Sequence, residues 1–234
     1  MTALLLRLAG PLQSWGDSSR FLRRDTNRYP TKSGVLGLLA AAMGVRRTDP
    51  IEELLRLRFG VRTDQPGVVI TDFQTAHTSG PKKPPTVTHR RYLADAVFVA
   101  GVQGDDALIE GLRSALERPA FPLFLGRRSC PVEGKLVLGV TEEDLPTALA
   151  EVPWQASDHH RRRERQSVPL PLVIDAAPDE VATAQTHDSP VSYDPRNRQH
   201  TWRPVVETTV SVDNPAGRST EGGLVDWLVG LERA

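Results

Sequence analysis

The chain has 234 residues, its 29 basic and 29 acidic side chains cancel, and hydrophobic residues make up 39% of it. This length allows one large domain or two small ones with a buried core, and the balanced charge excludes a global electrostatic field. The single cysteine, Cys130, excludes an internal disulfide and a cysteine-based zinc site. No stretch approaches the roughly 18 apolar residues that span a bilayer, and no signal peptide is recognisable. We therefore expect a soluble, cytoplasmic protein.

Apolar periodicity and turn residues divide the chain into short strands and helices. In chain order the sequence predicts strand 2–9, helix 31–43, helix 51–57, strands 58–63, 68–75, 86–93 and 96–102, helix 107–116, strand 135–140 and, after a less regular region, strand 205–212. The turn at 64–67 is predicted to join its two neighbouring strands as a hairpin. The order strand, helix, strand, strand, helix, strand is the ferredoxin-like pattern of an α+β fold.

The helix predicted at 31–43 begins next to a concentration of basic side chains. Thr31 or Ser33 can cap this helix, and Gly44 stops it. The helix N-terminus carries partial positive charge and free N–H donors, which suits phosphate. The nearby basic residues are Arg20, Arg23, Arg24, Arg28 and Lys32. We expect this helix end to present Lys32 and Ser33 to an anionic partner, with a solvated basic face as the alternative.

A nucleotide-hydrolysing phosphate loop does not explain this segment. That motif needs a glycine directly before the lysine and another glycine five residues earlier. Here Thr31 precedes Lys32, and no glycine lies between Gly16 and Gly34. An anion-binding helix end without nucleotide hydrolysis therefore remains the prediction for this part of the chain.

Residues 76–91 are predicted to form an exposed arm. The segment 79–85 contains three prolines and two lysines, a composition that a central strand does not tolerate. Basic and aromatic side chains follow at Arg90, Arg91 and Tyr92, which offers contacts for phosphates and for unstacked bases. Near the first strand, Gln13 and Ser14 are candidates for hydrogen bonds to a base edge, whereas Trp15 fits a core position better.

Four ordered blocks of the sequence together resemble one known family. They are residues 8–16 (LAGPLQSWG), 30–44 (PTKSGVLGLLAAAMG), 92–98 (YLADAVF) and 122–131 (PLFLGRRSCP), with weaker matches at 190–193 and 201–205. They are similar to the CasD subunit family of the type I-E CRISPR surveillance complex, Cascade, within the RAMP superfamily. The blocks keep their order over most of the chain, so the resemblance is more specific than any single block.

The resemblance implies a fold, a function and a set of partners. It implies a ferredoxin-like (RRM-like) palm at 1–146 with an inserted β-hairpin thumb near 76–91, and a C-terminal region at 147–234 packed on the palm. The function implied is non-catalytic binding of the repeat-derived 5′ handle of the CRISPR RNA, in support of antiviral DNA targeting. The partners implied are the backbone subunit CasC and the large subunit CasA, with target DNA nearby and no membrane. No cofactor is implied.

The candidate RNA-binding residues come from both lines of reasoning. The phosphate-binding role of the family maps onto Lys32 and Ser33 in one block and onto Arg127, Arg128 and Ser129 in another. The full predicted set is Gln13, Ser14, Arg20, Arg24, Arg28, Lys32, Ser33, His89, Arg90, Arg91, Tyr92, Arg127, Arg128 and Ser129.

The alternative function is metal-independent cleavage of CRISPR repeat RNA. Such chemistry needs a general base, an acid and a cation, which His89, Tyr92 and either Lys82 or Arg90 can supply in principle. The resemblance disfavours it, because cleavage in the type I-E system belongs to a separate subunit. A protein-binding scaffold without RNA would leave the basic cluster unexplained.

The basic run at 159–165 contains two adjacent histidines, which raises the question of a metal site. If His159 and His160 lie on a strand, their side chains point to opposite faces and cannot bind one ion together. No carboxylate-rich partner motif with ligand spacing lies nearby. We therefore expect no metal here, and a basic loop that contacts RNA or a neighbouring subunit is the more plausible interpretation.

Overall fold

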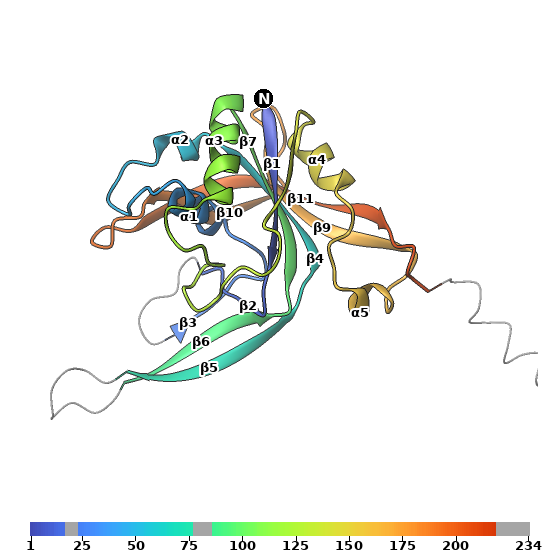
Figure 1. Cartoon of the computed structure of the whole chain (residues 1–234), viewed down its shortest axis with the longest axis horizontal. Helices are drawn as coiled ribbons and strands as arrows, with labels where there is room; N and C mark the ends of the chain where they lie inside the picture. Colours follow the sequence, from blue (N-terminus) through green and yellow to red (C-terminus); the bar gives the residue numbers. More distant parts are fainter. Residues whose placement is uncertain (17–22, 77–85, 219–234) are drawn as a thin grey trace, which may run out of the picture.

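The computed structural model describes residues 1–16, 23–76 and 86–218, and its architecture is a mixed α/β fold dominated by antiparallel sheets (Figure 1). No helix in these ranges is long and apolar enough to cross a membrane. The elements are β1 (Thr2–Ala9), β2 (Leu12–Gln13), β3 (Arg23–Arg24), α1 (Lys32–Ala42), α2 (Glu52–Leu55), β4 (Arg58–Gln65), β5 (Val68–Ala76), β6 (Thr86–Ala94), β7 (Val97–Gly104), α3 (Asp106–Glu117), β8 (Val137–Thr141), α4 (Leu145–Glu151), α5 (Asp158–Arg161), β9 (Ser167–Asp175), β10 (Ala184–Ser192) and β11 (Gln199–Asp213).

The larger sheet has seven strands in the order β10-β11-β9-β4-β7-β1-β8. All of its strand pairs are antiparallel. Its last three strands in the chain, β9 to β11, join the sheet through the pairing of β9 with β4. The expectation of a less regular C-terminal region is therefore wrong for residues 167–213. Pro169 and Pro171 made β9 hard to predict, because proline is rare inside sheets. Both lie where β9 pairs with β11 but not with β4, so the sheet tolerates their missing N–H groups.

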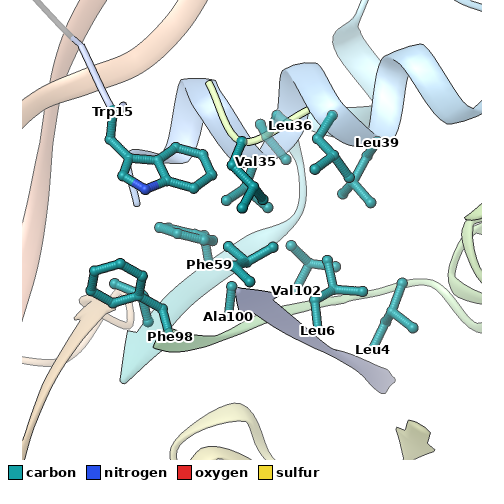
Figure 2. Close-up of a cluster of buried hydrophobic side chains, with 14 of the residues drawn as sticks. Leu4, Leu6, Trp15, Val35, Leu36, Leu39, Phe59, Phe98, Ala100 and Val102 are labelled. Atoms are coloured by element: carbon teal, nitrogen blue, oxygen red, sulfur yellow. The ribbon is translucent and has the colours of Figure 1, made fainter. Parts of the chain in front are cut away.

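Alternating side chains of the central strands fill two separate cores. Leu4, Leu6 and Val102 face α1, whose Leu36 and Leu39 pack above them (Figure 2). The other face of the same strands holds a second cluster of Ala3, Leu5, Val99, Leu145 and Leu149, the last two from α4. Since successive residues of a strand point to opposite faces, strands that are apolar throughout indicate a sheet covered on both sides.

The helix predicted at 31–43 is confirmed as α1, and its ends follow the predicted signals. Thr31 is the N-cap, and its hydroxyl oxygen accepts a hydrogen bond from Gly34 N at 3.2 Å. After the last helical residue, Gly44 adopts a φ of 79°, a left-handed conformation that glycine reaches without strain. The cap and the stop signal therefore fix the position from which this helix approaches the sheet.

The hairpin predicted at 64–67 is wrong. The strand β4 pairs with β7, whereas β5 pairs with β6. The segment 58–104 therefore forms one long hairpin that bends between two sheets, with Gln65 opposite Val97 on one side of the bend and Val68 opposite Ala94 on the other. We call β5 and β6 the arm; it extends away from the rest of the molecule (Figure 1). The arm thus starts at Val68, and its predicted tip at 79–85 lies outside the described residues.

Unusual backbone conformations build the bend at the base of the arm. Gly67 has a φ of 66°, and Asp95, between β6 and β7, has a φ of 55°. A Cβ at Gly67 would lie 2.4 Å from the carbonyl oxygen of Ala94. The Gln65 side chain crosses the bend and donates to the Asp95 carbonyl at 2.5 Å. These contacts determine the direction in which the arm leaves the body.

We predict that Gly67→Ala destabilises the protein by about 1–3 kcal/mol, because a side chain at positive φ is strained and this one also meets backbone. Gly111→Ala is the matched control, since a Cβ at this helical position meets nothing within 4 Å. That control should stabilise the protein by roughly 0.5–1 kcal/mol. Urea denaturation of both variants measures the difference, and equal stability of Gly67→Ala and wild type would contradict the strained bend.

Candidate nucleic-acid interface

The N-terminus of α1 does bind an anion, but that anion belongs to the same chain. Lys32 N donates to the Asp188 carboxylate at 2.8 Å, and the Lys32 ammonium lies 2.8 Å from Asp175. Lys32 is 7% exposed, and Ser33 is 1% exposed. The expectation that the helix end presents these two side chains to an outside ligand is therefore wrong, because the internal carboxylates occupy the positions of the expected anion.

Arg203 joins the two carboxylates into one buried network. Its guanidinium lies 2.6 Å from Asp188 and 2.5 Å from Asp175. Burial disfavours the charged guanidinium, but hydrogen bonding and attraction from Asp188, followed by Asp175, hold the pKa of Arg203 above its ordinary value. The network connects α1 to strands β9, β10 and β11, which the sequence pattern alone did not bring together.

A β-bulge in β10 places Asp188 inside the protein. Thr186 pairs with Arg203 and Ser189 pairs with Thr201, so β10 carries one more residue than β11 between these pairs. An extra residue reverses the side-chain alternation locally. Asp188 is therefore fully buried beside Arg203, although its neighbour His187 remains partly exposed.

Gln13 and Ser14 are also committed to contacts within the chain. The Gln13 amide nitrogen donates to the carbonyl oxygens of Leu8 at 3.1 Å and Ala96 at 2.7 Å, and its oxygen accepts from Trp15 Nε1 at 3.0 Å. Ser14 Oγ donates to a carbonyl oxygen of β6 at 3.3 Å. Both residues are buried, as is Trp15, which fits its interpretation as a core residue. Buried and hydrogen-bonded groups cannot read a base edge, so they are better explained as structural.

Arg127 organises the base of the arm. Its guanidinium donates to the carbonyl oxygens of Arg91 at 3.0 Å and Arg24 at 2.8 Å, which ties β3 to β6. The same guanidinium lies 4.8 Å from the centre of the buried Tyr92 ring, within the range of a cation–π contact. Arg127 is therefore half-buried and positions its neighbours, and Tyr92 offers no free ring face for stacking at this point.

Exposed cationic side chains surround Arg127 and its contacts. Arg24, Arg91 and Arg128 are exposed, and Arg91 makes an ion pair of 3.3 Å with the similarly exposed Asp25. Arg90 is half-buried, and its Nε is a buried donor with no hydrogen-bond partner among the described residues. We call Arg24, Arg90, Arg91 and Arg128 the arm-base arginines. They surround the base of the arm, on β3, on β6 and on a loop; Arg90 and Arg91 are successive residues of β6, so their side chains point to its opposite faces.

The remaining predicted residues lie around the same region or beyond it. Ser129 is exposed next to Arg128, and its hydroxyl contacts the buried Cys130 thiol. Arg28 is exposed farther along the segment that follows β3. Arg20 lies outside the described residues. Burial raises the pKa of the Cys130 thiol, which makes it a structural residue instead of a reactive one.

The acid–base set of the catalytic alternative does not come together. His89 pairs with Phe73 across the arm and Tyr92 pairs with Ile70, so the side chains of His89 and Tyr92 lie on opposite faces of β6. The His89 ring packs edge-on against Phe73, with ring centres 4.7 Å apart. Tyr92 is 3% exposed under Arg127. One scissile phosphate cannot meet both groups in this arrangement, and Lys82 lies outside the described residues.

The basic run at 159–165 differs from its sequence interpretation. His159 and His160 lie in the short helix α5 instead of a strand. His160 packs edge-on against the buried Trp154, with ring centres 5.7 Å apart. Arg162, Arg163 and Arg165 are exposed beyond this contact. Helix α5 lies apart from β3 and from the outer part of the arm (Figure 1).

Comparison with known proteins gives consistent matches over this fold. The family model described as "CRISPR-associated protein (Cas_Cas5)" matches residues 3–206. The CRISPR system Cascade subunit CasD of Escherichia coli (strain K12) is 36% identical over 163 residues, which cover 61% of this chain and 73% of that protein.

Solved structures agree with these sequence matches. A chain of a CRISPR RNA-guided surveillance complex superposes with a TM-score of 0.76 at 34% identity, covering 93% of both chains. The crystal structure of a Cas protein superposes with a TM-score of 0.70 at 36% identity, covering 93% of this chain and 98% of the other. The chain therefore belongs to the Cas5 family of CRISPR-associated proteins.

Proposed function

We propose that this chain is a non-catalytic, RNA-binding subunit of a CRISPR surveillance complex, in which it anchors the repeat-derived 5′ handle of the CRISPR RNA. The observation that carries this proposal is the group of arm-base arginines next to a projecting hairpin. Guanidinium groups bind phosphates through charge-assisted hydrogen bonds, and a hairpin that leaves the body can cross a strand of RNA. By holding the handle, the subunit supports assembly of the complex for antiviral DNA targeting.

The finer description of the fold belongs to the same proposal. Strands β4, β7, β1 and β8 are adjacent in that order, and helices α1 and α3 both pack in the core on one face of them. This arrangement supports a ferredoxin-like palm at 1–146. The arm serves as its thumb, and residues 147–234 form the C-terminal region, whose strands β9 to β11 extend the palm sheet.

The arm also offers surfaces to neighbouring proteins. Val68, Ile70 and Phe73 of β5 are exposed, and β5 pairs on one side only among the described strands. Exposed apolar side chains on an unpaired strand edge are typical of a surface that a partner covers. The backbone subunit CasC and the large subunit CasA are the partners that we propose, with target DNA nearby in the assembled complex.

One experiment separates binding from cleavage. The purified chain is mixed with end-labelled CRISPR repeat RNA, and each sample is divided between a retention assay and a denaturing gel. We expect retained RNA of unchanged length, because His89 and Tyr92 lie on opposite faces of β6. Cleavage at a defined position, lost on His89→Ala, would establish the endoribonuclease alternative instead.

A further inference from the structure

A cleft with aromatic walls lies farther along the chain segment that begins at Arg24, one of the arm-base arginines. Its volume is about 620 Å³, and it opens where the segment after β3 passes the hairpin of β10 and β11. The lining residues are Asn27, Arg28, Tyr29, Gln185, Thr186, His187 and Trp202. Arg28 is the one predicted RNA-binding residue among them.

Trp202 is the unusual residue of this cleft. Its side chain is 62% exposed, although large aromatic residues are normally well buried. The ring of His187 lies beside it, with ring centres 5.0 Å apart and a tilt of 58°. The next residue in the chain, Arg203, is 6% exposed and held by two carboxylates. Trp202 therefore directly precedes a backbone position that Arg203 anchors, and its indole is open to solvent beside His187.

The other walls add a cation and hydrogen-bonding groups. Arg28 is exposed at the cleft, and the Tyr29 hydroxyl is engaged with Thr186, so the Tyr29 ring is held in place. Gln185 supplies an exposed amide. A flat aromatic face with a nearby guanidinium and polar groups matches one unstacked nucleotide, because every base has a π-face and every nucleotide carries a phosphate.

We propose that this cleft takes one unpaired base of the bound RNA, stacked on Trp202, with the adjoining phosphate at Arg28. The proposal rests on the proposed RNA-binding function and adds a second contact site to it. The chain from Arg24 to Tyr29 leads from the arm base to the cleft, so one strand of RNA can follow this segment and reach both sites. The cleft would then fix the position of one base in the handle relative to the arm.

The test compares stacking with charge. Trp202→Ala should weaken binding of repeat RNA by roughly 5- to 150-fold, the range for loss of one base–aromatic stack, and Trp202→Phe should retain most of the affinity. The salt dependence should not change in Trp202→Ala, because no phosphate contact is lost. Arg28→Ala should reduce the log–log salt slope by about 0.7. Phe121→Ala, which removes an exposed ring of 42% accessibility elsewhere, is the matched control and should bind as wild type.

A series of RNAs with one abasic position each identifies the base. At one position, wild type and Trp202→Ala should bind the abasic RNA equally, because the stacking partner is already missing. If wild type binds repeat RNA but Trp202→Ala binds every RNA as tightly, the cleft proposal is overturned and the proposed function stands. If Trp202→Ala keeps its RNA affinity and loses only assembly with protein subunits, the cleft binds a protein, and the proposal that it binds a base is overturned. If wild type binds no RNA, both proposals fail.

Discussion

Arg62→Ala should lower the free energy of unfolding by about 3–5 kcal/mol, the cost of removing one partner from a buried ion pair. Arg62 on β4 has no exposed surface, and its guanidinium makes two hydrogen bonds to the Asp64 carboxylate at 2.7 and 2.9 Å. It also donates to the carbonyl oxygens of Leu149 at 2.6 Å and Val152 at 2.7 Å. Without Arg62, the Asp64 carboxylate and the carbonyls at the end of α4 would remain buried with fewer donors.

The measurement is thermal or urea unfolding of the variant. For a chain of this length the expected loss corresponds to a fall in melting temperature of roughly 6–20 °C. Arg113→Ala is the matched control, because Arg113 also pairs with carboxylates, Glu110 and Glu117, but lies partly exposed on α3. Water and salt screen that pair, so its loss should change the melting temperature little. Equal falls in melting temperature for the two variants would show that burial does not determine how much these ion pairs stabilise the protein.

Replacing Arg24, Arg90 and Arg128 together by alanine should weaken binding of repeat RNA by roughly 100-fold or more. Each is expected to lose a charge-assisted hydrogen bond to phosphate. The charge-matched control is the triple variant Arg46→Ala, Arg56→Ala and Arg118→Ala, which removes three exposed arginines outside the arm and outside the basic run at 159–165. Titration of labelled RNA at one fixed salt concentration compares the two. An equal loss in both triple variants would mean that net charge, and not the arm base, governs binding.

Burial distinguishes Arg24, Arg90 and Arg128 from the other predicted phosphate-binding cations. Lys32 and Arg127 were equally attractive from the sequence, but Lys32 is held by Asp175 and Arg127 by backbone carbonyls. Substituting either would disturb packing as well as charge, so a loss of RNA binding would have two explanations. Arg24 and Arg128 are exposed to solvent. Arg90 is half-buried, and its Nε has no hydrogen-bond partner among the described residues.

Local features of the fold could be predicted from the sequence because they depend on neighbouring residues. The Thr31 side chain caps α1. Gly44 ends the helix, because a residue without a side chain reaches positive φ without strain. The helix predicted at 107–116 is likewise present as α3, and its Leu112 and Leu116 are buried. The family resemblance was confirmed because four separated blocks kept their order, which is information that no single motif carries.

Long-range pairing could not be predicted in the same way. The turn at 64–67 has hairpin composition, yet β5 pairs with β6 because the chain bends there at Gly67 and Asp95. The interpretation of Lys32 failed for a related reason. Its partner Asp175 lies on β9, far away in the sequence, and an arginine-rich neighbourhood does not reveal an internal carboxylate. Trp202 was missed as a candidate binding residue because the sequence does not show whether a given tryptophan is buried or exposed.

Salt dependence of RNA binding tests most directly the central claim that the arm-base arginines hold RNA phosphates. Binding of labelled repeat RNA is measured over a range of salt concentrations for wild type and for the variant lacking Arg24, Arg90 and Arg128. The slope of log affinity against log salt should fall by about 2 in the variant, since each phosphate contact on a single strand contributes about 0.7. Parallel lines for a folded variant and wild type would contradict the claim.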